Sequence, residues 1–354
     1  MTYTTIDLFA GAGGLSLGFA CAGSATAIFR PTFAVEHDSA AALTYKVNFD
    51  AHVHDGDIEL FDPASYPEAD VILGGPPCQG FSPLGRDRDE TSRATLNGLW
   101  EHYLEAVIRV NPRAFVIENV PQFQRSPQFR ELLRLMQSNR QLARYGLSFG
   151  VLNAADYGVP QMRRRGILVA VRDSEVPWPP PPSHGSQSPA ETPHVTVREA
   201  IGDLPAAPTT DKPTTKIDGS QDLHIRRNPT PLSLTRYRCI PPGGNRFDLQ
   251  RKRPDITPPC WLKKSTGTTD VMGRMWWDRP SPTIRTEFFK PEKGRYLHPE
   301  LHRPITHREA ARLQSFPDWF VFEGTKVEVA RQIGNATPPG LGRALANFVA
   351  SLLA

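Results

Sequence analysis

The chain has few cysteines, no long apolar run and little excess charge, and each shortage excludes a class of protein. Its four cysteines are spread over 354 residues, so we expect neither a disulfide framework nor a metal site. No apolar stretch approaches the roughly 20 residues that a membrane helix needs. The first residues lack the basic and apolar segments of a secretory signal, so we expect a cytoplasmic, nucleoid-associated protein with no membrane partner.

The composition is that of an ordinary globular protein, with 39% hydrophobic and 22% charged residues. A chain of 354 residues can form one large or two unequal domains. A formal net charge of +4 permits an anionic partner without requiring one. We expect the chain to act as a monomer.

The first half of the chain alternates strand-like and helix-like segments, as in a doubly wound α/β domain. Helical patterns lie at 99–110 and 128–136. Seven strands are predicted, at residues 4–8, 32–36, 52–57, 70–73, 114–118, 147–153 and 166–171. We therefore predict a mostly parallel seven-stranded sheet that is large enough to hold a nucleotide-like cofactor at its carboxyl edge.

This regularity ends at the proline-rich residues 177–182, which can continue neither a helix nor a central strand. The chain is then irregular to about residue 305, and helical periodicity returns at 308–316 and 338–353. We predict one domain of residues 1–175 plus 306–354, and a smaller, irregular domain of residues 176–305.

Cys78 stands out by its surroundings, Gly74-Gly75-Pro76-Pro77-Cys78-Gln79-Gly80-Phe81-Ser82. Glycine and proline indicate a loop, and the apolar residues just before them indicate the end of a buried strand. Most cysteines in globular proteins are buried and inert. A cysteine on a stiff loop at the carboxyl edge of a sheet instead suggests a nucleophile for covalent catalysis.

Three successive strand ends carry residues that suit an adenosine-bearing cofactor. A turn with Gly11 and Gly13 follows the first strand and opens a helix, so backbone N–H groups can approach a ligand. Glu36 ends the second strand and could hold ribose hydroxyls. Asp57 and Ile58 end the third and offer a carboxylate and an apolar wall. Each acid alone could be a solvated loop residue or a helix cap, but their successive positions favour the cofactor.

Glu118 and two arginines are predicted at the same edge. Glu118 follows an apolar strand, where partial desolvation suits it to share a proton. Arg163 and Arg165 precede the last strand, and an extended backbone would place both on one side, where they could hold a polarised oxygen. The alternatives are a structural glutamate and a solvated basic surface.

The irregular domain contains many basic residues interleaved with aromatic ones, among them Arg236, Arg238 and Arg246. Acidic residues are sparser there. Such a surface suits contact with a nucleic-acid backbone, although irregular surface domains are often basic without that function.

Together these blocks resemble the C5-cytosine DNA methyltransferase family of bacterial restriction–modification systems. The matching blocks stand in the family's order at residues 7–11, 75–79, 118–120, 161–165, 308–317 and 332–336. Only residues 176–270, the region where the family's target-recognition domain varies, carry no resemblance. Thr337 departs from the apolar residue that many relatives have there.

The resemblance implies a sheet of the S-adenosylmethionine-dependent methyltransferase type, S-adenosylmethionine as methyl donor, and double-stranded DNA as substrate. A cognate restriction endonuclease would act separately. The residues implied near the cofactor are Phe9, Ala10, Gly11, Gly13, Glu36, Asp57, Ile58, Pro77, Leu96 and Asn335. The implied catalytic residues are Cys78, Glu118, Arg163 and Arg165. The DNA contacts expected are Gln79, Ser82, Asn119, Arg236, Arg238 and Arg246.

Three other functions fit parts of the pattern. A tRNA cytosine-5 methyltransferase of the same family would keep the same blocks, although the large basic insert favours DNA. A nicotinamide-dependent aldehyde-oxidising enzyme would also need a glycine-rich turn, an acidic residue and a catalytic cysteine. A degenerate enzyme could keep only a DNA-binding domain.

Overall fold

The computed structural model describes residues 1–22, 27–77, 90–216, 220–263 and 269–354, apart from the side chains of residues 90–97. These residues form two compact units. The first comprises Met1–Gly158, Arg164–Thr192 and Ala336–Ala354, and the second comprises Val159–Arg163 and Pro193–Asn335. In the described part of the chain, no helix is long and apolar enough to cross a membrane.

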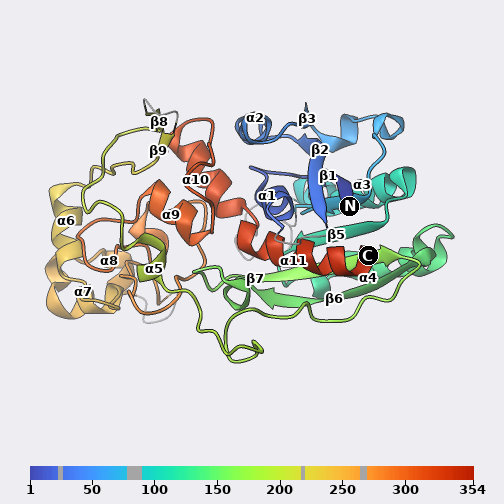
Figure 1. The fold of residues 1–354 in the computed structure, drawn as a ribbon. Coiled ribbons are helices and arrows are strands. Elements are labelled where there is room, and N and C mark those ends of the chain that lie inside the picture. Colours follow the sequence, from blue (N-terminus) through green and yellow to red (C-terminus); the bar gives the residue numbers. More distant parts are fainter. Residues whose placement is uncertain (23–26, 78–89, 217–219, 264–268) are drawn as a thin grey trace. The chain divides into compact units, whose positions relative to one another are not determined.

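The first unit is built on a seven-stranded sheet, shown in Figure 1. Strands β1 to β5 run parallel, and β7 is antiparallel to both of its neighbours in the order β3-β2-β1-β4-β5-β7-β6. The strands are β1 (Thr2–Leu8), β2 (Ile28–Glu36), β3 (His52–Asp55), β4 (Val71–Gly74), β5 (Ala114–Asn119), β6 (Tyr145–Asn153) and β7 (Arg164–Arg172). The predicted mostly parallel seven-stranded sheet is confirmed.

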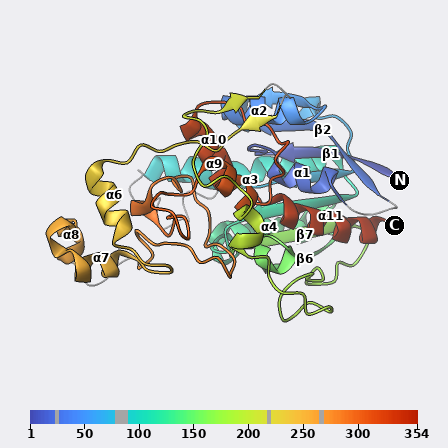
Figure 2. The ribbon, with the colours of Figure 1, turned by 60° about the vertical axis from the view of Figure 1, so that its left-hand side comes forward.

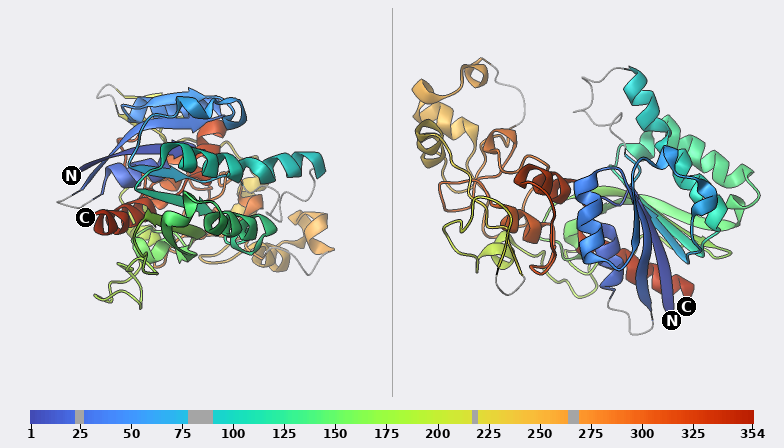
Figure 3. Two further views of the ribbon diagram at one scale, coloured as in Figure 1. Left: turned by 90° about the vertical axis from the view of Figure 1, so that its right-hand side faces the viewer. Right: turned by 90° about the horizontal axis from the view of Figure 1, so that it is seen from above.

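Helices cover both faces of this sheet, as Figure 3 shows. Helices α1 (Gly14–Ala20), α2 (Ser39–Asn48) and α11 (Pro339–Leu353) lie on one face. Helices α3 (Glu90–Val110) and α4 (Pro127–Ser138) cover the other. Because both faces are covered, central strands such as β4 and β5 are apolar on both sides, which explains their continuous hydrophobic sequences.

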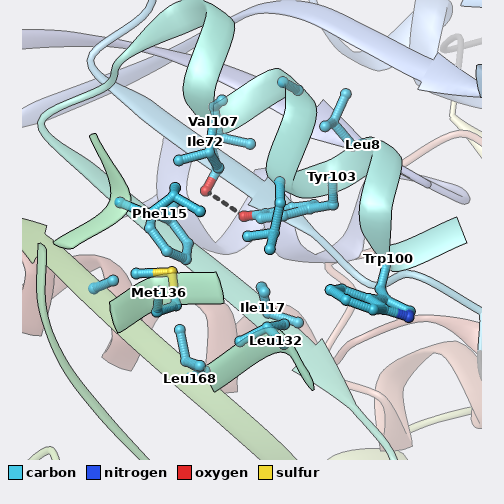
Figure 4. Packing of buried hydrophobic residues seen from close by; sticks show 14 of the residues in the cluster. Leu8, Ile72, Trp100, Tyr103, Val107, Phe115, Ile117, Leu132, Met136 and Leu168 are labelled. Atoms are coloured by element: carbon cyan, nitrogen blue, oxygen red, sulfur yellow. Dashed lines mark hydrogen bonds between the residues drawn. The ribbon is translucent and has the colours of Figure 1, made fainter. Parts of the chain in front are cut away.

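The core under α3 and α4 contains few polar groups (Figure 4), and the one that joins helix to sheet is the Tyr103 hydroxyl. The Tyr103 hydroxyl reaches the carbonyl oxygens of Ile72 at 3.0 Å and Val116 at 2.9 Å. Tyr103 is fully buried, and burial raises its pKa well above the ordinary value. The hydroxyl therefore stays protonated, and α3 is tied to the two central strands β4 and β5.

The strand order reverses between β1 and β4. Crossovers from β1 lead through α1 and α2 to one side, and crossovers from β4 lead through α3 to the other. In such sheets the loops that leave the two neighbouring strands diverge and open a crevice, where ligands bind. The glycine-rich turn after β1 and the residues after β4 occupy this position.

Helices α1 and α11 pack closely at Gly18. A Cβ atom at Gly18 would lie 2.5 Å from the Pro339 carbonyl oxygen and 2.6 Å from the Arg343 amide nitrogen. These backbone atoms cannot move aside as a flexible side chain could. We expect Gly18→Val to cost about 3 kcal/mol of unfolding free energy and to lower the melting temperature in thermal unfolding.

Gly98 in α3 is the matched control, because no atom of the described residues lies within 4 Å of the place its Cβ would take. Gly98→Ala should leave stability unchanged or raise it by up to about 1 kcal/mol through better helix propensity. Equal melting temperatures for Gly18→Val and the wild type would contradict the close packing of α1 against α11.

The second unit contains short helices, one small hairpin and long irregular segments (Figure 2). Its strands are β8 (Thr214–Thr215) and β9 (Gln221–Asp222). Its helices are α5 (Val197–Ile201), α6 (Pro231–Arg238), α7 (Arg246–Lys252), α8 (Pro259–Leu262), α9 (His307–Leu313) and α10 (Lys326–Asn335).

A buried guanidinium group joins the irregular segments of this unit. Arg274 is 1% exposed, and it donates hydrogen bonds to the carbonyl oxygens of Tyr237, Ile240, His298 and Leu301. Burial lowers its pKa to about 10, so the group remains charged near neutrality. The rigid fork of donors satisfies backbone acceptors that neither a helix nor a sheet pairs here.

The boundaries of the two units differ from the predicted ones. Residues 176–192 belong to the first unit, because the segment after β7 packs on β6: Ser148 donates to the Val176 carbonyl, and Tyr157 donates to the Pro180 carbonyl. Helices α9 and α10 belong to the second unit, although residues 306–335 were expected in the first. The alternating strand pattern ends at the proline-rich segment, but the segment still packs against β6 and the turn that follows it.

Candidate active site

The turn after β1 has an unusual backbone. Phe9, Gly11 and Gly13 all have positive φ angles, of 59°, 54° and 83°. Gly13 caps the start of α1, and its N–H donates to the Ala10 carbonyl at 2.9 Å. The left-handed residues fold the chain back tightly at the carboxyl end of β1.

Glu36 holds this turn in place. Its two carboxylate oxygens accept the N–H groups of Gly11 at 2.7 Å and Asp38 at 2.8 Å. Oε2 keeps a second lone pair, whereas Oε1 also lies against His37, so the buried carboxylate can still accept a hydrogen bond from a ribose hydroxyl through Oε2. The predicted ribose contact therefore fits the geometry.

His37 was not predicted from the sequence. Its Nδ1 lies 3.1 Å from the Glu36 carboxylate, and the hydrogen bond to Glu36 raises the pKa of the imidazole. An exposed histidine after an acidic residue is common, so the sequence offered no signal for it. The imidazolium would compensate the Glu36 charge at this strand end.

Asp57 and Ile58 lie just beyond the third strand. β3 ends at Asp55 and not at Asp57 as predicted: the Gly56 N–H makes the last bond to β2, to the Glu36 carbonyl, and the chain then enters a short turn. Asp57 is exposed and makes no capping hydrogen bond to the short 3-10 turn η1 (Ile58–Leu60) that follows. Ile58 is 6% exposed and packs in the core.

A buried polar chain supports the turn from below. Asp7 at the end of β1 accepts a hydrogen bond from the Ser16 hydroxyl at 2.7 Å, and Ser16 accepts one from Tyr45 at 2.7 Å. Asp7 is 1% exposed, and burial, aided by the charge of Glu36, raises its pKa to about 7. The three residues tie β1, α1 and α2 together, and their separation in sequence hid this contact.

We expect Asp7 to make stability depend on pH. The pKa of its carboxyl is about 7 in the folded protein, against an ordinary aspartate value of 3.8, which we take for the unfolded chain. The unfolded state therefore ionises first, and folding free energy is lost as the pH rises from about 4 to 7 and levels off above that. In Asp7→Asn this loss should disappear, because the amide oxygen still accepts from Ser16 but does not titrate.

Denaturant unfolding at several pH values measures the effect. Between pH 5 and pH 8 the stability of Asp7→Asn relative to the wild type should improve by about 2–3 kcal/mol, at about 1.4 kcal/mol for each unit of pKa difference. A difference between the two proteins that stays constant with pH would show that Asp7 is already ionised in the folded state.

The residues after β4 lead toward the predicted nucleophile. Asn119 at the end of β5 is 5% exposed and donates its side-chain amide to the Pro76 carbonyl at 2.9 Å. One N–H of this amide is therefore engaged with the loop, and the DNA contact expected of Asn119 stays a prediction. Cys78, Gln79 and Ser82 lie outside the described residues, as does the side chain of Leu96.

Glu118 and Arg165 form the central pair of the site. The Arg165 Nε lies 2.7 Å from the Glu118 Oε1, and the two side chains are only 15% and 12% exposed. They come from the neighbouring strands β7 and β5. A Cβ atom on Gly75 would stand 3.2 Å from the Glu118 Oε2, so this carboxylate lies against the segment that leads to Cys78.

Arg163 has a different environment from Arg165. It belongs to the second unit, where its guanidinium is 1% exposed and donates to the carbonyl oxygens of Ile284 at 2.9 Å and Gly334 at 3.0 Å. Gln161 is buried in the same unit and pairs with Gln314 at 2.8 Å. Arg163 therefore holds the end of α10, and the catalytic role expected of it stays a prediction.

The remaining predicted residues also lie in the second unit. Asn335 is exposed at the end of α10. Arg238 is exposed, whereas Arg236 donates to the Ile256 carbonyl at 2.8 Å. Arg246 is only 4% exposed and stacks on Phe247, with its Cζ 4.8 Å from the ring centre. Of the three arginines expected to bind DNA, Arg238 alone presents an exposed guanidinium.

Comparison with known proteins identifies relatives along the whole chain. The family model described as C-5 cytosine-specific DNA methylase matches residues 3–350. The chain is 31% identical to Type II methyltransferase M.AgeI of Thalassovita gelatinovora, over 98% of each chain. It is 35% identical to Type II methyltransferase M.XorII of Xanthomonas oryzae pv. oryzae, over 98% of this chain and 84% of that one.

A solved structure is also similar. It is described as a DNA modification methyltransferase encoded within an E. coli prophage, and it superimposes with a TM-score of 0.72 at 25% sequence identity. The similarity covers 99% of both chains.

Proposed function

Because the chain belongs to the C-5 cytosine-specific DNA methylase family and is a DNA (cytosine-5-)-methyltransferase of the restriction–modification type, we propose that Cys78, Glu118 and Arg165 perform the transfer. The observation that carries this proposal is the Glu118–Arg165 pair, which packs against the segment leading to Cys78. A carboxyl group and a guanidinium at one edge can polarise a pyrimidine ring that a nucleophile attacks.

The first step makes C5 of cytosine nucleophilic. The Cys78 thiolate attacks C6 and forms a C–S bond, while Glu118 delivers a proton to N3. Arg165, held by Glu118, donates to the O2 oxygen, so that charge is compensated where it develops. The product of this step is a neutral enamine with its electron density at C5.

The second step uses the methyl donor. S-adenosylmethionine, the cofactor that the family implies, would supply the electrophilic methyl group to C5 of the enamine, and its sulfur–methyl bond would break to leave S-adenosylhomocysteine. A base, for which water suffices, then removes the C5 proton, the electron pair restores the 5,6 double bond as Cys78 leaves as the thiolate, and the N3 proton returns to Glu118. The target cytosine must be turned out of the duplex, at a cost of a few kcal/mol.

The cofactor residues fit the turn after β1 and the two strand ends next to it. The Glu36 carboxylate would accept a hydrogen bond from a ribose hydroxyl, and exposed Asp57 with buried Ile58 would hold the adenine amino group and ring. The turn at Phe9, Ala10, Gly11 and Gly13 would face the methionine part with backbone groups. Pro77, Leu96 and Asn335 complete the proposed set.

The second unit would recognise the DNA. The described residues 231–263 span helices α6 to α8. They include seven basic residues and two acidic ones, Asp248 and Asp255. The basic residues are Arg236, Arg238, Arg246, Arg251, Lys252, Arg253 and Lys263. Such an excess attracts phosphates independently of sequence. Gln79 and Ser82 would contact the target nucleotide, and a separate endonuclease would cut the unmodified site.

Sequencing the methylome of cells that express the chain tests this proposal. We expect one short motif modified at cytosine C5, and modified adenine or N4-cytosine would contradict the chemistry. Transfer of labelled methyl groups to duplex DNA or to tRNA in vitro separates the substrate classes. Transfer confined to tRNA would favour the tRNA-methylating branch of the family instead.

A further inference from the structure

The second unit contains a cavity that has no part in the function proposed above. It has a volume of about 280 Å³. It lies among the segment that follows β9, the segment that leads into α9 and the first turn of α10; these three elements are labelled in Figure 1. None of the residues proposed to hold the cofactor or to read DNA lines it.

Aromatic and aliphatic side chains form one wall of the cavity, and the Lys290 ammonium lies 5.4 Å from the centre of the Phe289 ring. The Phe289 ring stacks on the His307 imidazole with ring centres 6.1 Å apart and planes at 12°, and Ile225 and Ile305 complete the wall. His307 donates its Nε2–H to the Lys326 carbonyl at 2.7 Å. Burial lowers the His307 pKa to about 4, so the ring is neutral under physiological conditions.

Three cations at the cavity are incompletely neutralised. The carboxylates of Asp211 and Glu292 lie 3.9 Å from Arg226 and 3.7 Å from Arg227. Both distances exceed the roughly 2.7–2.9 Å of a charge-assisted hydrogen bond. For Lys326, no described carboxylate lies within the 4.0 Å limit of an ion pair. These side chains can therefore bind an anion.

A fourth cation at the cavity, Arg303, differs from these three in that its charge is compensated. Arg303 donates two parallel hydrogen bonds, of 2.8 Å and 2.7 Å, to the Glu309 carboxylate. It supports the wall and is not available to a ligand. No acidic residue of the described chain lines the cavity, so its field is positive.

We propose that this cavity binds one phosphodiester of the DNA strand, with the phosphate on Arg227 and Lys326 and the attached sugar or base against Phe289. Guanidinium groups match phosphate oxygens in a forked geometry, and a ring can stack on an aromatic face without regard to base identity. Such a contact positions the duplex but carries no sequence information. The inference rests on the proposed DNA methylation.

The salt dependence of DNA binding tests it. In the double variant Arg227→Ala/Lys326→Ala, the slope of log K against log[KCl] should become shallower by about 0.9, the value for one lost phosphate contact. The change should be equal for a duplex with the methylated motif and for an unrelated duplex, measured by fluorescence anisotropy. Lys293→Ala, an exposed cation outside the cavity, should leave the slope unchanged.

If the variant melts like the wild type and its slope is unchanged, the cavity does not bind a DNA phosphate. If it instead loses binding of polyglutamate while the DNA slope stays the same, the cavity serves an acidic protein segment, and the DNA assignment is overturned. Lys326→Ala alone, at an exposed position, provides the same test should the double variant fail to fold. Failure of the wild type to methylate any DNA would instead refute the proposed function.

Discussion

Glu118→Gln should lower kcat for methyl transfer by about 10²–10⁴-fold, the usual contribution of general acid catalysis. Glutamine keeps the size and one hydrogen-bond acceptor of the side chain, but it cannot deliver a proton to N3 as the thiolate attacks C6. Without that proton the attack would leave a negative charge on the ring, which Arg165 alone would have to stabilise. The rate is measured as transfer of labelled methyl groups to duplex DNA under single-turnover conditions.

The matched control for this variant is Glu131→Gln. Glu131 pairs with Arg134 at 2.6 Å, close to the 2.7 Å of the Arg165–Glu118 pair. Both side chains of the Glu131–Arg134 pair are exposed on α4. Breaking this surface pair should change neither kcat nor stability appreciably. A Glu118→Gln variant that melts normally and keeps its rate within about threefold of the wild type would remove Glu118 from the acid role.

The sheet could be predicted from the sequence because its strands are buried on both faces. β4 and β5 have sequences in which nearly every residue is apolar, and a fully covered parallel sheet requires this. The seven predicted strands all occur, with ends shifted by a few residues. Helices α2 and α10 were not predicted; the short, mixed sequence of α2 has weak helical periodicity, whereas α10 buries a regular apolar face.

The pairing of site residues could be predicted less well. The Glu118–Arg165 contact follows from two neighbouring strands, and the sequence motif indicated both residues. The Asn119–Pro76 and Asp7–Ser16 hydrogen bonds depend on side-chain directions at strand ends, which composition does not reveal. Arg163 and Arg165 are two residues apart, yet one anchors α10 in the second unit and the other pairs with Glu118, because β7 begins between them.

The boundary between the two units could also be predicted only in part. Prolines at 177–182 correctly indicate that regular structure ends, but they do not reveal that the segment remains on β6. Tertiary contacts of the extended chain decide where a unit ends, and an extended segment has no periodicity that would report them.

Replacement of Cys78 has the largest expected effect. Cys78→Ala removes the nucleophile itself, so methylation should fall by at least about 10⁴-fold, to the background of an enzyme that only binds its substrates. Folding should be unaffected, and Cys21→Ala, which removes an exposed cysteine outside the sequence motif, should keep full activity.

Covalent trapping on DNA that contains 5-fluorocytosine tests the central claim most directly. Fluorine at C5 cannot leave as a proton does, so the enzyme stays bonded to C6 after methyl transfer and migrates as a denaturant-resistant complex. We expect this complex with the wild type and with Cys21→Ala in the presence of S-adenosylmethionine, and none with Cys78→Ala. A covalent complex formed by Cys78→Ala, or wild-type methylation of normal DNA without any trapping on the fluorinated DNA, would contradict the proposed mechanism.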